Sequence, residues 1–359
     1  MYGEAASERV HGSLALYERI FATYTGLDWR HVRDRAGPFA DAIDDYDEQL
    51  LPELEGVAEG AGVEAEDVLA LNVRTEVMFG LDERAAQAAA EAGAEAGECT
   101  ALCARTVPAE GGRTIHAQNW DWKPGAAKTC VLLACAPHGR PGFVTLVEAG
   151  LLAKCGMNEA GVALTANALM SSRDRGAPGV PFHAILRRVL TAATFEEAVE
   201  AVTRPVRASS GNYLISDGHG HSVNVETGPG GPEAVYATGT PSLAHANHFL
   251  WQDRPFKDVG RIGGDDSLRR QAAAERALAA GGGADALVEV LRDHQNYPDS
   301  VCAHRDAELA PEMDYVTIAS IVMRPALRTM DVSQGSPCEQ PYDALDVAEL
   351  VASARTAAV

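Results

Sequence analysis

A cysteine and an aspartate, Cys99 and Asp121, are the residues whose types and spacing best suit them to chemistry. Two runs with β-branched residues flank a Pro/Gly-containing turn and predict a β-hairpin. A turn centred on Glu110 would pair Val107 with Arg113. The same register would set Cys99 opposite Asp121. A thiol reacts as a thiolate or beside a proton acceptor, so this hairpin predicts a nucleophile next to a carboxylate. The alternative for Cys99 is a buried strand thiol with no reactivity.

The segment that leads into Cys99 is an Ala/Gly/Glu tract, residues 83–98, with no side chains that could fill a core. This composition is typical of a solvated tether. Cleavage of the Glu98–Cys99 bond would free an α-amine with a reference pKa of about 7.7–8.0. Such an amine can accept the thiol proton near neutral pH, so nucleophile and base would belong to one residue.

Further motifs along the chain resemble one known family, in the order in which that family has them. They are Glu98-Cys99-Thr100, Gln118-Asn119-Trp120-Asp121, Gly156-Met157-Asn158-Glu159-Ala160-Gly161-Val162 with Asn167, His245-Ala246-Asn247-His248-Phe249, Asp293-His294 with Ser300-Val301-Cys302, and Gly335-Ser336-Pro337-Cys338. The chain resembles the acyl-CoA:6-aminopenicillanic acid acyltransferase (isopenicillin N acyltransferase, peptidase C45-like) family of the N-terminal nucleophile (Ntn) hydrolases. The resemblance implies the four-layer αββα sandwich of that superfamily.

The resemblance also implies roles for individual residues. Asp121 would serve the nucleophile and its amine, with a turn aspartate as the alternative. Asn167 and Asn247 would donate to the oxyanion of acyl transfer, with strand-end or turn asparagines as the alternative. Bile-salt and penicillin V hydrolases have arginine where this chain has Gln118.

A second departure from the family lies after the Ser-x-Cys segment. Many members have an arginine there, where this chain has Ala303. Arg305 is a candidate substitute. Because of the two departures, the substrate specificity of the relatives is not transferred to this chain.

The elements that would position these residues fall into two parts. Apolar spacing predicts a helical pro-segment over residues 1–98, with helices at 7–24, 52–62 and 64–77. Residues 99–359 would form the catalytic domain, an α+β fold of antiparallel sheets covered by helices. Beyond the nucleophile hairpin, strands are predicted at 128–136, 142–150, 151–156, 162–169, 212–216, 222–227, 234–238, 315–323 and 328–332, and helices at 181–190, 194–202, 266–280 and 284–294.

Charge and composition narrow the class of partner. The net charge is −21, which repels nucleic acid and anionic lipid, and no dense Lys/Arg cluster is present. The longest apolar run is too short to span a bilayer, and the first residues lack a secretory signal, so a cytoplasmic protein is expected. Seven cysteines without an export signal predict free thiols rather than a disulfide framework.

No cofactor and no metal are expected from the motifs. His245 with His248, and His219 with His221, could be proposed as zinc ligands, but the chain has no H-E-x-x-H pattern. Phosphate-binding P-loop, G-x-S-x-G and Rossmann patterns are also missing from the sequence.

The leading hypothesis is a self-processing Ntn enzyme that forms an acyl-thioester on Cys99 from a small-molecule linear amide and passes the acyl group to water or an amine. Cleavage between Glu98 and Cys99 would leave the pro-segment and the catalytic chain associated. The alternatives are an acyl-CoA-dependent N-acyltransferase with the same nucleophile, a catalytically silent binding protein of the same fold, and a zinc hydrolase. The scarcity of lysine favours amide hydrolysis over use of an acyl-CoA, whose phosphates need cationic groups.

Overall fold

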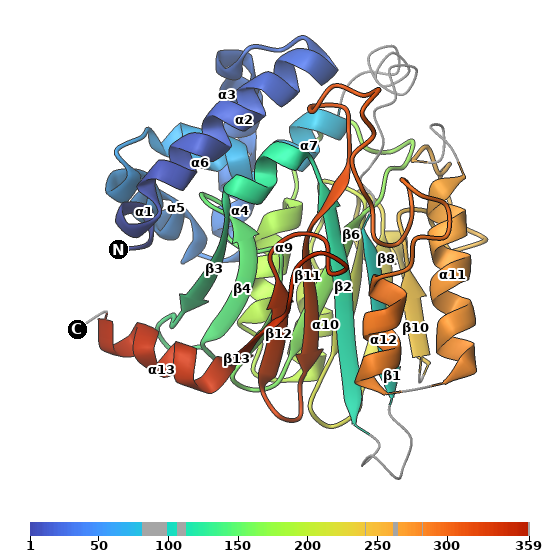
Figure 1. The fold of residues 1–359 in the computed structure, drawn as a ribbon. Coiled ribbons are helices and arrows are strands. Elements are labelled where there is room, and N and C mark those ends of the chain that lie inside the picture. The colour runs from blue at the N-terminus through green and yellow to red at the C-terminus, as the bar shows by residue number, and fades with distance from the viewer. Residues whose placement is uncertain (81–98, 106–112, 241, 261–264, 282, 358–359) are drawn as a thin grey trace.

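Two antiparallel sheets lie face to face in the computed structural model of this chain, with helices on their outer faces (Figure 1). The structure describes residues 1–80, 99–105, 113–240, 242–260, 265–281 and 283–357. The predicted tether at 83–98 and the turn around Glu110 lie outside the described residues. The expectation of an α+β, four-layer αββα sandwich is confirmed.

The first sheet has six strands in the order β10-β1-β2-β11-β12-β13. Its members are β1 (Thr100–Arg105), β2 (Thr114–Trp122), β10 (Ser242–His245), β11 (Val316–Arg324), β12 (Thr329–Ser333) and β13 (Asp343–Asp346). The second sheet has seven strands in chain order: β3 (Cys130–Cys135), β4 (Phe143–Glu148), β5 (Cys155–Asn158), β6 (Ala163–Ala168), β7 (Gly211–Ser216), β8 (Ser222–Thr227) and β9 (Val235–Thr238).

Helices cover the outer face of each sheet. Helices α11 (Asp266–Ala280) and α12 (Ala284–Leu291) pack on the six-stranded sheet, and α9 (Phe182–Leu190) and α10 (Phe195–Thr203) pack on the seven-stranded one. The Thr194 cap predicted for α10 is present, because its side chain accepts a hydrogen bond from the Glu197 amide, while the Glu197 carboxylate accepts from the Ala193 amide. Near the C-terminus, α13 (Val347–Ala357) packs against β3 and β4.

The N-terminal helices form a separate layer at one end of the sandwich (Figure 1). They are α1 (Tyr2–Ala5), α2 (Ser7–Thr25), α3 (Trp29–Ala36), α4 (Ala40–Tyr46), α5 (Leu50–Ala61), α6 (Ala65–Asn72) and α7 (Arg74–Phe79), with a short 3₁₀ turn at η1 (Gly37–Phe39). Elsewhere in the described residues, 3₁₀ turns occur at η3 (Pro124–Lys128) and η4 (Pro232–Ala234). Their apolar side chains belong to the same buried cluster as those of the seven-stranded sheet. The N-terminal helices and the sheets therefore share one core. None of the helices among the described residues is both long and apolar enough to cross a membrane.

Buried polar contacts fix this layer to the sheets. The Tyr17 hydroxyl donates to Glu148 over 2.8 Å, and the Arg74 guanidinium pairs with the same carboxylate at 2.7 Å. The Asn72 amide donates to the Gly150 carbonyl, also over 2.8 Å. Burial of such charges is favourable only when they are paired and hydrogen-bonded, so these contacts specify how the helices sit on the sheet.

The predicted register of the nucleophile hairpin is wrong by one residue. The structure pairs Thr100 with Asn119 and Leu102 with Ala117, so Cys99 does not lie opposite Asp121. Opposite residues in an antiparallel pair point to the same face. The observed pairing puts Leu102 and Ala117 together under α11 and α12, whereas the predicted pairing would have set Leu102 beside the polar Gln118.

A second prediction is wrong in position. The strand expected at 151–156 is β5, Cys155–Asn158, because the chain turns only after Asn158. The Asn158 amide donates to the Val162 carbonyl, and the Asn158 side-chain oxygen accepts from the Val162 amide. Gly161 adopts a φ of 87° in this turn, a conformation that favours glycine. The individual elements α1, α3, α4, α13, β10 and β13 were not predicted from the sequence, and the helix expected at 284–294 ends at Leu291.

Candidate active site

Cys99 lies directly before β1, with its side chain buried between the sheets at 4% exposure. Its thiol donates a weak hydrogen bond to the backbone carbonyl of Asp121, with an Sγ–O distance of 3.8 Å. The backbone carbonyl of Cys99 accepts two hydrogen bonds, from Asn167 Nδ2 and from Arg270 Nη1, each over 2.9 Å. Two side chains therefore fix the backbone of Cys99, and the thiol itself makes only one weak hydrogen bond.

Asp121 is the penultimate residue of β2, and only one of its two carboxylate oxygens has a hydrogen-bond partner among the described residues. Its Oδ1 accepts from the Thr317 hydroxyl over 2.6 Å, while the buried Oδ2 has no hydrogen-bond partner among the described residues. Burial raises the pKa of Asp121 to about 7, although Arg270 and the Thr317 hydrogen bond act in the opposite direction. Oδ2 is thus an unused acceptor close to Cys99.

Asn167 lies in β6 and faces Cys99 across the gap between the sheets. Its Nδ2 donates to the Cys99 carbonyl and, over 3.0 Å, to the His245 carbonyl. Its Oδ1 lies 3.4 Å from the Asn212 amide. A carboxamide nitrogen has only two N–H donors, so both are occupied here. In this geometry Asn167 fixes the backbone of Cys99.

Asn247 lies two residues after the end of β10, and its side chain contacts Arg270. Its Nδ2 donates to the Ala168 carbonyl over 3.0 Å, and its Oδ1 accepts from the Arg270 guanidinium at 3.3 Å. The second N–H of this amide has no partner among the described residues. The four predicted residues, Cys99, Asp121, Asn167 and Asn247, are therefore brought together at one place.

Arg270 links Cys99 to Asn247, and it was not among the residues predicted from the sequence. This α11 residue is 1% exposed, and it donates to the Cys99 carbonyl, to Asn247 Oδ1 and, over 3.1 Å, to Thr100 Oγ1. Arg305, the candidate named from the sequence, instead pairs with Asp314 at 2.7 Å and is largely solvent-exposed. The arginine that contacts Cys99 therefore comes from helix α11 rather than from the Ser-x-Cys segment.

Lys154 is a second cation that the sequence analysis missed. Its Nζ donates to the Ala166 carbonyl over 2.7 Å, and the Gln118 side chain donates to the same oxygen over 2.9 Å. Burial raises the pKa of the Cys99 thiol. Lys154 and, more weakly, Arg270 oppose that rise, while the Asp121 carboxylate adds to it. Lys154 therefore lies next to Gln118.

The histidine pairs considered from the sequence do not form a metal cluster. His245 pairs with Glu226 at 2.6 Å, His221 with Asp217 at 2.8 Å, and His248 contacts the Ser267 hydroxyl. Among the described residues, none of these histidines belongs to a group of three or more converging ligands.

A thiol at the start of a strand, with a carboxylate and carboxamides around it between two antiparallel sheets, fits the Ntn-hydrolase class that the αββα fold defines. The chain belongs to the acyl-coenzyme A:6-aminopenicillanic acid acyl-transferase family, whose model matches residues 108–339. The matched range contains Asp121, Asn167 and Asn247 and begins after Cys99.

Individual relatives agree with this family. The chain is 29% identical over 273 residues, 71% of each chain, to the acyl-coenzyme A:6-aminopenicillanic-acid-acyltransferase 40 kDa form of Emericella nidulans. Solved structures similar to it include a Caenorhabditis elegans N-acylethanolamine-hydrolyzing acid amidase ortholog, at 18% identity and a TM-score of 0.46 over 64% of this chain and 94% of that one. Penicillin V acylase from Agrobacterium tumefaciens matches at 17% identity and a TM-score of 0.40 over 70% and 87%.

Proposed function

We propose that this chain is a self-processing Ntn enzyme that cleaves or transfers the acyl group of a small-molecule linear amide through a thioester on Cys99. The observation that carries the proposal is that Asp121, Asn167 and Arg270 all contact that one buried cysteine, with Asn247 hydrogen-bonded to Arg270 beside it. Family membership supports acyl transfer as the class of reaction.

The state of the thiol supports cleavage between Glu98 and Cys99. Burial keeps the pKa of Cys99 high, so the thiol needs a base close to it. In the processing step Sγ would attack the Glu98 carbonyl, the C–N bond would break, and the Cys99 nitrogen would take the proton. Water would then hydrolyse the thioester, which releases the Glu98 carboxylate and restores the thiol.

The freed α-amine would have a ready partner in Asp121. The unpaired Oδ2 of this carboxylate can accept a hydrogen bond from the amine, and the Thr317 hydroxyl holds the other oxygen. Asn167 and Arg270 would keep the Cys99 backbone in place through its carbonyl. The amine would accept the thiol proton in the attack and return it to the leaving amine of the substrate.

Asn247 is the residue we assign to the oxyanion. One of its amide N–H groups has no partner among the described residues, whereas both donors of Asn167 are used on backbone carbonyls. A donor aimed at the developing negative charge stabilises the tetrahedral intermediate. The oxyanion role expected for both asparagines is therefore assigned to Asn247, and Asn167 is assigned to positioning Cys99.

A division into a pro-segment of residues 1–98 and a catalytic chain of residues 99–359 is part of the proposal. The shared core and the buried contacts of Glu148 with Tyr17 and Arg74 support association of the two chains after cleavage.

An acyl-CoA-dependent N-acyltransferase is the second candidate, favoured by the family and by the Emericella nidulans relative. The two candidates share the thioester and differ in the acyl donor. Incubation with N-acyl amino acids, β-lactam amides and acyl-CoAs, with product analysis by mass spectrometry, separates them.

Cys99→Ala is the test of the nucleophile in either case. The variant should form no acyl adduct and no product with any donor. Cys135→Ser, a half-buried thiol in β3, is the matched control and should keep full activity. Full amidase activity in Cys99→Ala, or a wild-type protein that forms no adduct with any of the three donor classes, would overturn the proposal. The latter result would favour a catalytically silent binding protein.

A further inference from the structure

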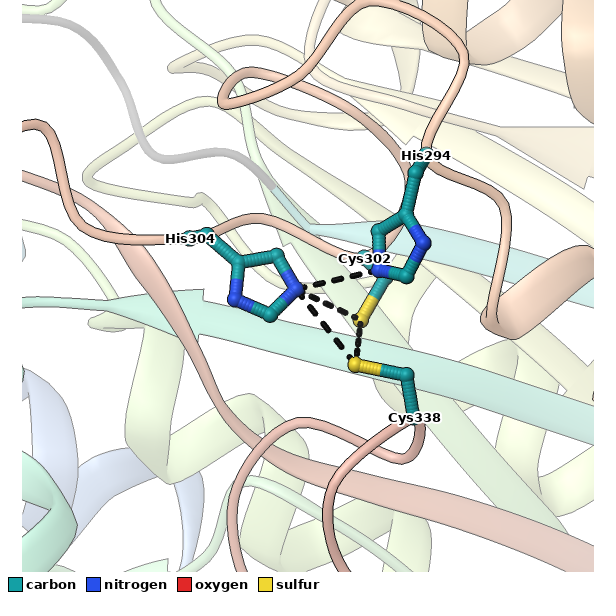
Figure 2. Close-up of side chains that lie close together, drawn as sticks. All are labelled: His294, Cys302, His304 and Cys338. Atoms are coloured by element: carbon teal, nitrogen blue, oxygen red, sulfur yellow. Dashed lines mark hydrogen bonds between the residues drawn. The ribbon is translucent and has the colours of Figure 1, made fainter.

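Four side chains that could ligate a metal converge at the surface of the molecule, outside the proposed active site (Figure 2). His294, Cys302 and His304 come from the segment between α12 and β11, and Cys338 comes from the segment between β12 and β13. One ligand atom from each of the four lies within 4.8 Å of the others. Cys302 is buried, His304 is half-buried, and the other two side chains are exposed.

Three of the distances between these atoms fall in the range of the edges of a metal-centred tetrahedron, and a fourth, between the two imidazole nitrogens, is shorter. His304 Nε2 lies 3.0 Å from His294 Nε2, 3.6 Å from Cys302 Sγ and 3.4 Å from Cys338 Sγ, and the two sulfur atoms are 3.5 Å apart. Bond lengths of about 2.3 Å to sulfur and about 2.0–2.1 Å to nitrogen, in tetrahedral geometry, give edges of roughly 3.3–3.8 Å.

Hydrogen bonds alone do not account for this arrangement. An imidazole nitrogen carries either one proton or one lone pair, so His304 Nε2 cannot satisfy three neighbours at once. Thiols are weak donors and weak acceptors and add little. A cation at the centre would satisfy all four atoms together.

The backbone around the ligands is itself tied down. The Cys302 amide donates to the Asp293 carbonyl over 3.0 Å, and the His304 amide donates to the Pro298 carbonyl over 3.1 Å. The Arg292 guanidinium donates over 3.0 Å to the Pro337 carbonyl, which joins the segment of Cys338 to the end of α12. The Glu339 carboxylate lies 3.7 Å from His304 Nδ1, beyond hydrogen-bond distance but beside the ring nitrogen that a metal ion at Nε2 would leave free.

We propose that His294, Cys302, His304 and Cys338 bind one Zn²⁺ ion in a closed structural site. Thiolate and imidazole ligands in a tetrahedral set select zinc over the hard cations magnesium and calcium. Four protein ligands leave no position for water or substrate, which distinguishes a structural site from a catalytic one. Binding would displace the protons of the two thiols, so that two thiolates and two neutral imidazoles hold the ion.

The position of the site suggests what the ion would stabilise. Ala303, between two of the ligands, donates its amide to Thr317 Oγ1 over 2.9 Å and accepts from the Thr317 amide over 3.0 Å. The same hydroxyl donates to Asp121 Oδ1. The ion would therefore hold the segment that positions Thr317, and through it Asp121. The zinc proposal does not depend on the proposed acyl chemistry.

The first test is the metal content of the full-length protein, purified without chelator and with reductant from zinc-supplemented cells. We expect about one zinc ion per chain, as a four-ligand site requires. Cys338→Ser and His294→Ala change exposed ligands and should lower the zinc content at least tenfold. Cys135→Ser and His219→Ala are the matched controls and should retain it. A protein without zinc, or ligand variants that retain it, would overturn the proposal.

The second test uses the wild-type fold, so it does not depend on the folding of a variant. Removal of the metal by a chelator should lower the melting temperature, and Zn²⁺ should restore it. Co²⁺ added to the metal-free protein should give the visible bands of a tetrahedral site and the sulfur-to-cobalt charge-transfer band. Cobalt spectra without a sulfur contribution would contradict the assignment. A Cys302–Cys338 disulfide in peptides from protein kept under reductant would also contradict it.

Discussion

At Cys99, burial has two opposite consequences. It shields a thioester from bulk water, and it raises the pKa of the thiol, because a thiolate is poorly solvated between the sheets. Lys154 and Arg270 reduce this cost but do not remove it. A neutral base beside the sulfur would let the buried thiol lose its proton during the attack, and the α-amine of Cys99 would be such a base.

Asn247→Ala tests the assignment of the oxyanion donor. We expect turnover to fall by about 10²–10³, the usual effect of removing one such donor. Thiol labelling of Cys99 should stay intact, because the nucleophile is unchanged. The measurements are steady-state kinetics and alkylation followed by mass spectrometry. The exposed amide variant Gln252→Ala is the control, and wild-type turnover in Asn247→Ala would exclude the role.

The carboxyl of Asp121 makes a pH-dependent contribution to stability. Its pKa in the folded protein is about 7, above the ordinary 3.8, so the folded state binds the proton more tightly than the unfolded state. This carboxyl therefore favours folding below about pH 4, and the advantage is lost as the pH rises through 7. By about 1.36 kcal/mol per pKa unit, the change is on the order of 4 kcal/mol.

Asp121→Asn removes this titration. In a Cys99→Ala background, which avoids processing, the double variant should become more stable relative to its parent as the pH rises from 4 to 8. Denaturant unfolding at several pH values measures the difference. A constant difference across this range would show that Asp121 is not protonated in the folded protein below neutrality.

At the scale of elements, a buried ion pair contributes to the attachment of the N-terminal helices, beside the shared apolar core. Arg74 in α7 and Glu148 in β4 are both almost completely buried, with the Arg74 guanidinium 4.9 Å from the centre of the Tyr17 ring. Removal of one partner leaves the other charged and unpaired in the core.

Arg74→Ala should therefore destabilise the protein by about 3–5 kcal/mol, the usual cost of breaking a buried pair. Chemical denaturation measures the loss, and gel filtration of cleaved protein would report release of the N-terminal fragment. Arg204→Ala removes an exposed pair with Glu200 and should cost less than about 1 kcal/mol. Equal effects of the two substitutions would contradict this view of the attachment.

Elements with a strong local signal could be predicted from the sequence, and those fixed by distant contacts could not. The capping box at Thr194 and the hairpin between Cys99 and Asp121 carry their patterns in neighbouring residues. Strands β10 and β13, four residues each, were not recognised from their own sequences, and they form by pairing with β1 and β12. The hairpin register was wrong because it depends on which face packs under α11 and α12.

Residues of the candidate sites that are placed by distant contacts also could not be predicted from the sequence. Arg270 stands in an amphipathic helix, where an arginine usually faces solvent, and only the packing of α11 on β1 and β10 turns it toward Cys99. The proposed zinc ligands have irregular spacing, from His294 to Cys302 and then to a distant Cys338, which matches no standard zinc pattern. We expected no metal from the motifs, and the proposed zinc site revises that expectation.

For the whole molecule, the central claim is that the chain cuts itself so that Cys99 becomes an N-terminal residue. The shared core explains how two chains would remain one folded unit after the cut. Glycine precedes the nucleophile in the penicillin acyltransferase pattern, and Glu98 stands there in this chain. The residue before the proposed cleavage site is therefore a further departure from that pattern, beside Gln118 and Ala303.

Intact-mass spectrometry of the freshly purified, denatured protein tests the claim most directly. We predict two chains that separate at Cys99, one covering residues 1–98 and one covering residues 99–359, in equal amounts. Cys99→Ala should give one uncut chain in the same measurement. A single uncut wild-type chain that is nevertheless an active amidase or acyltransferase would contradict the account, because its Cys99 nitrogen would still be an amide and could not accept the thiol proton.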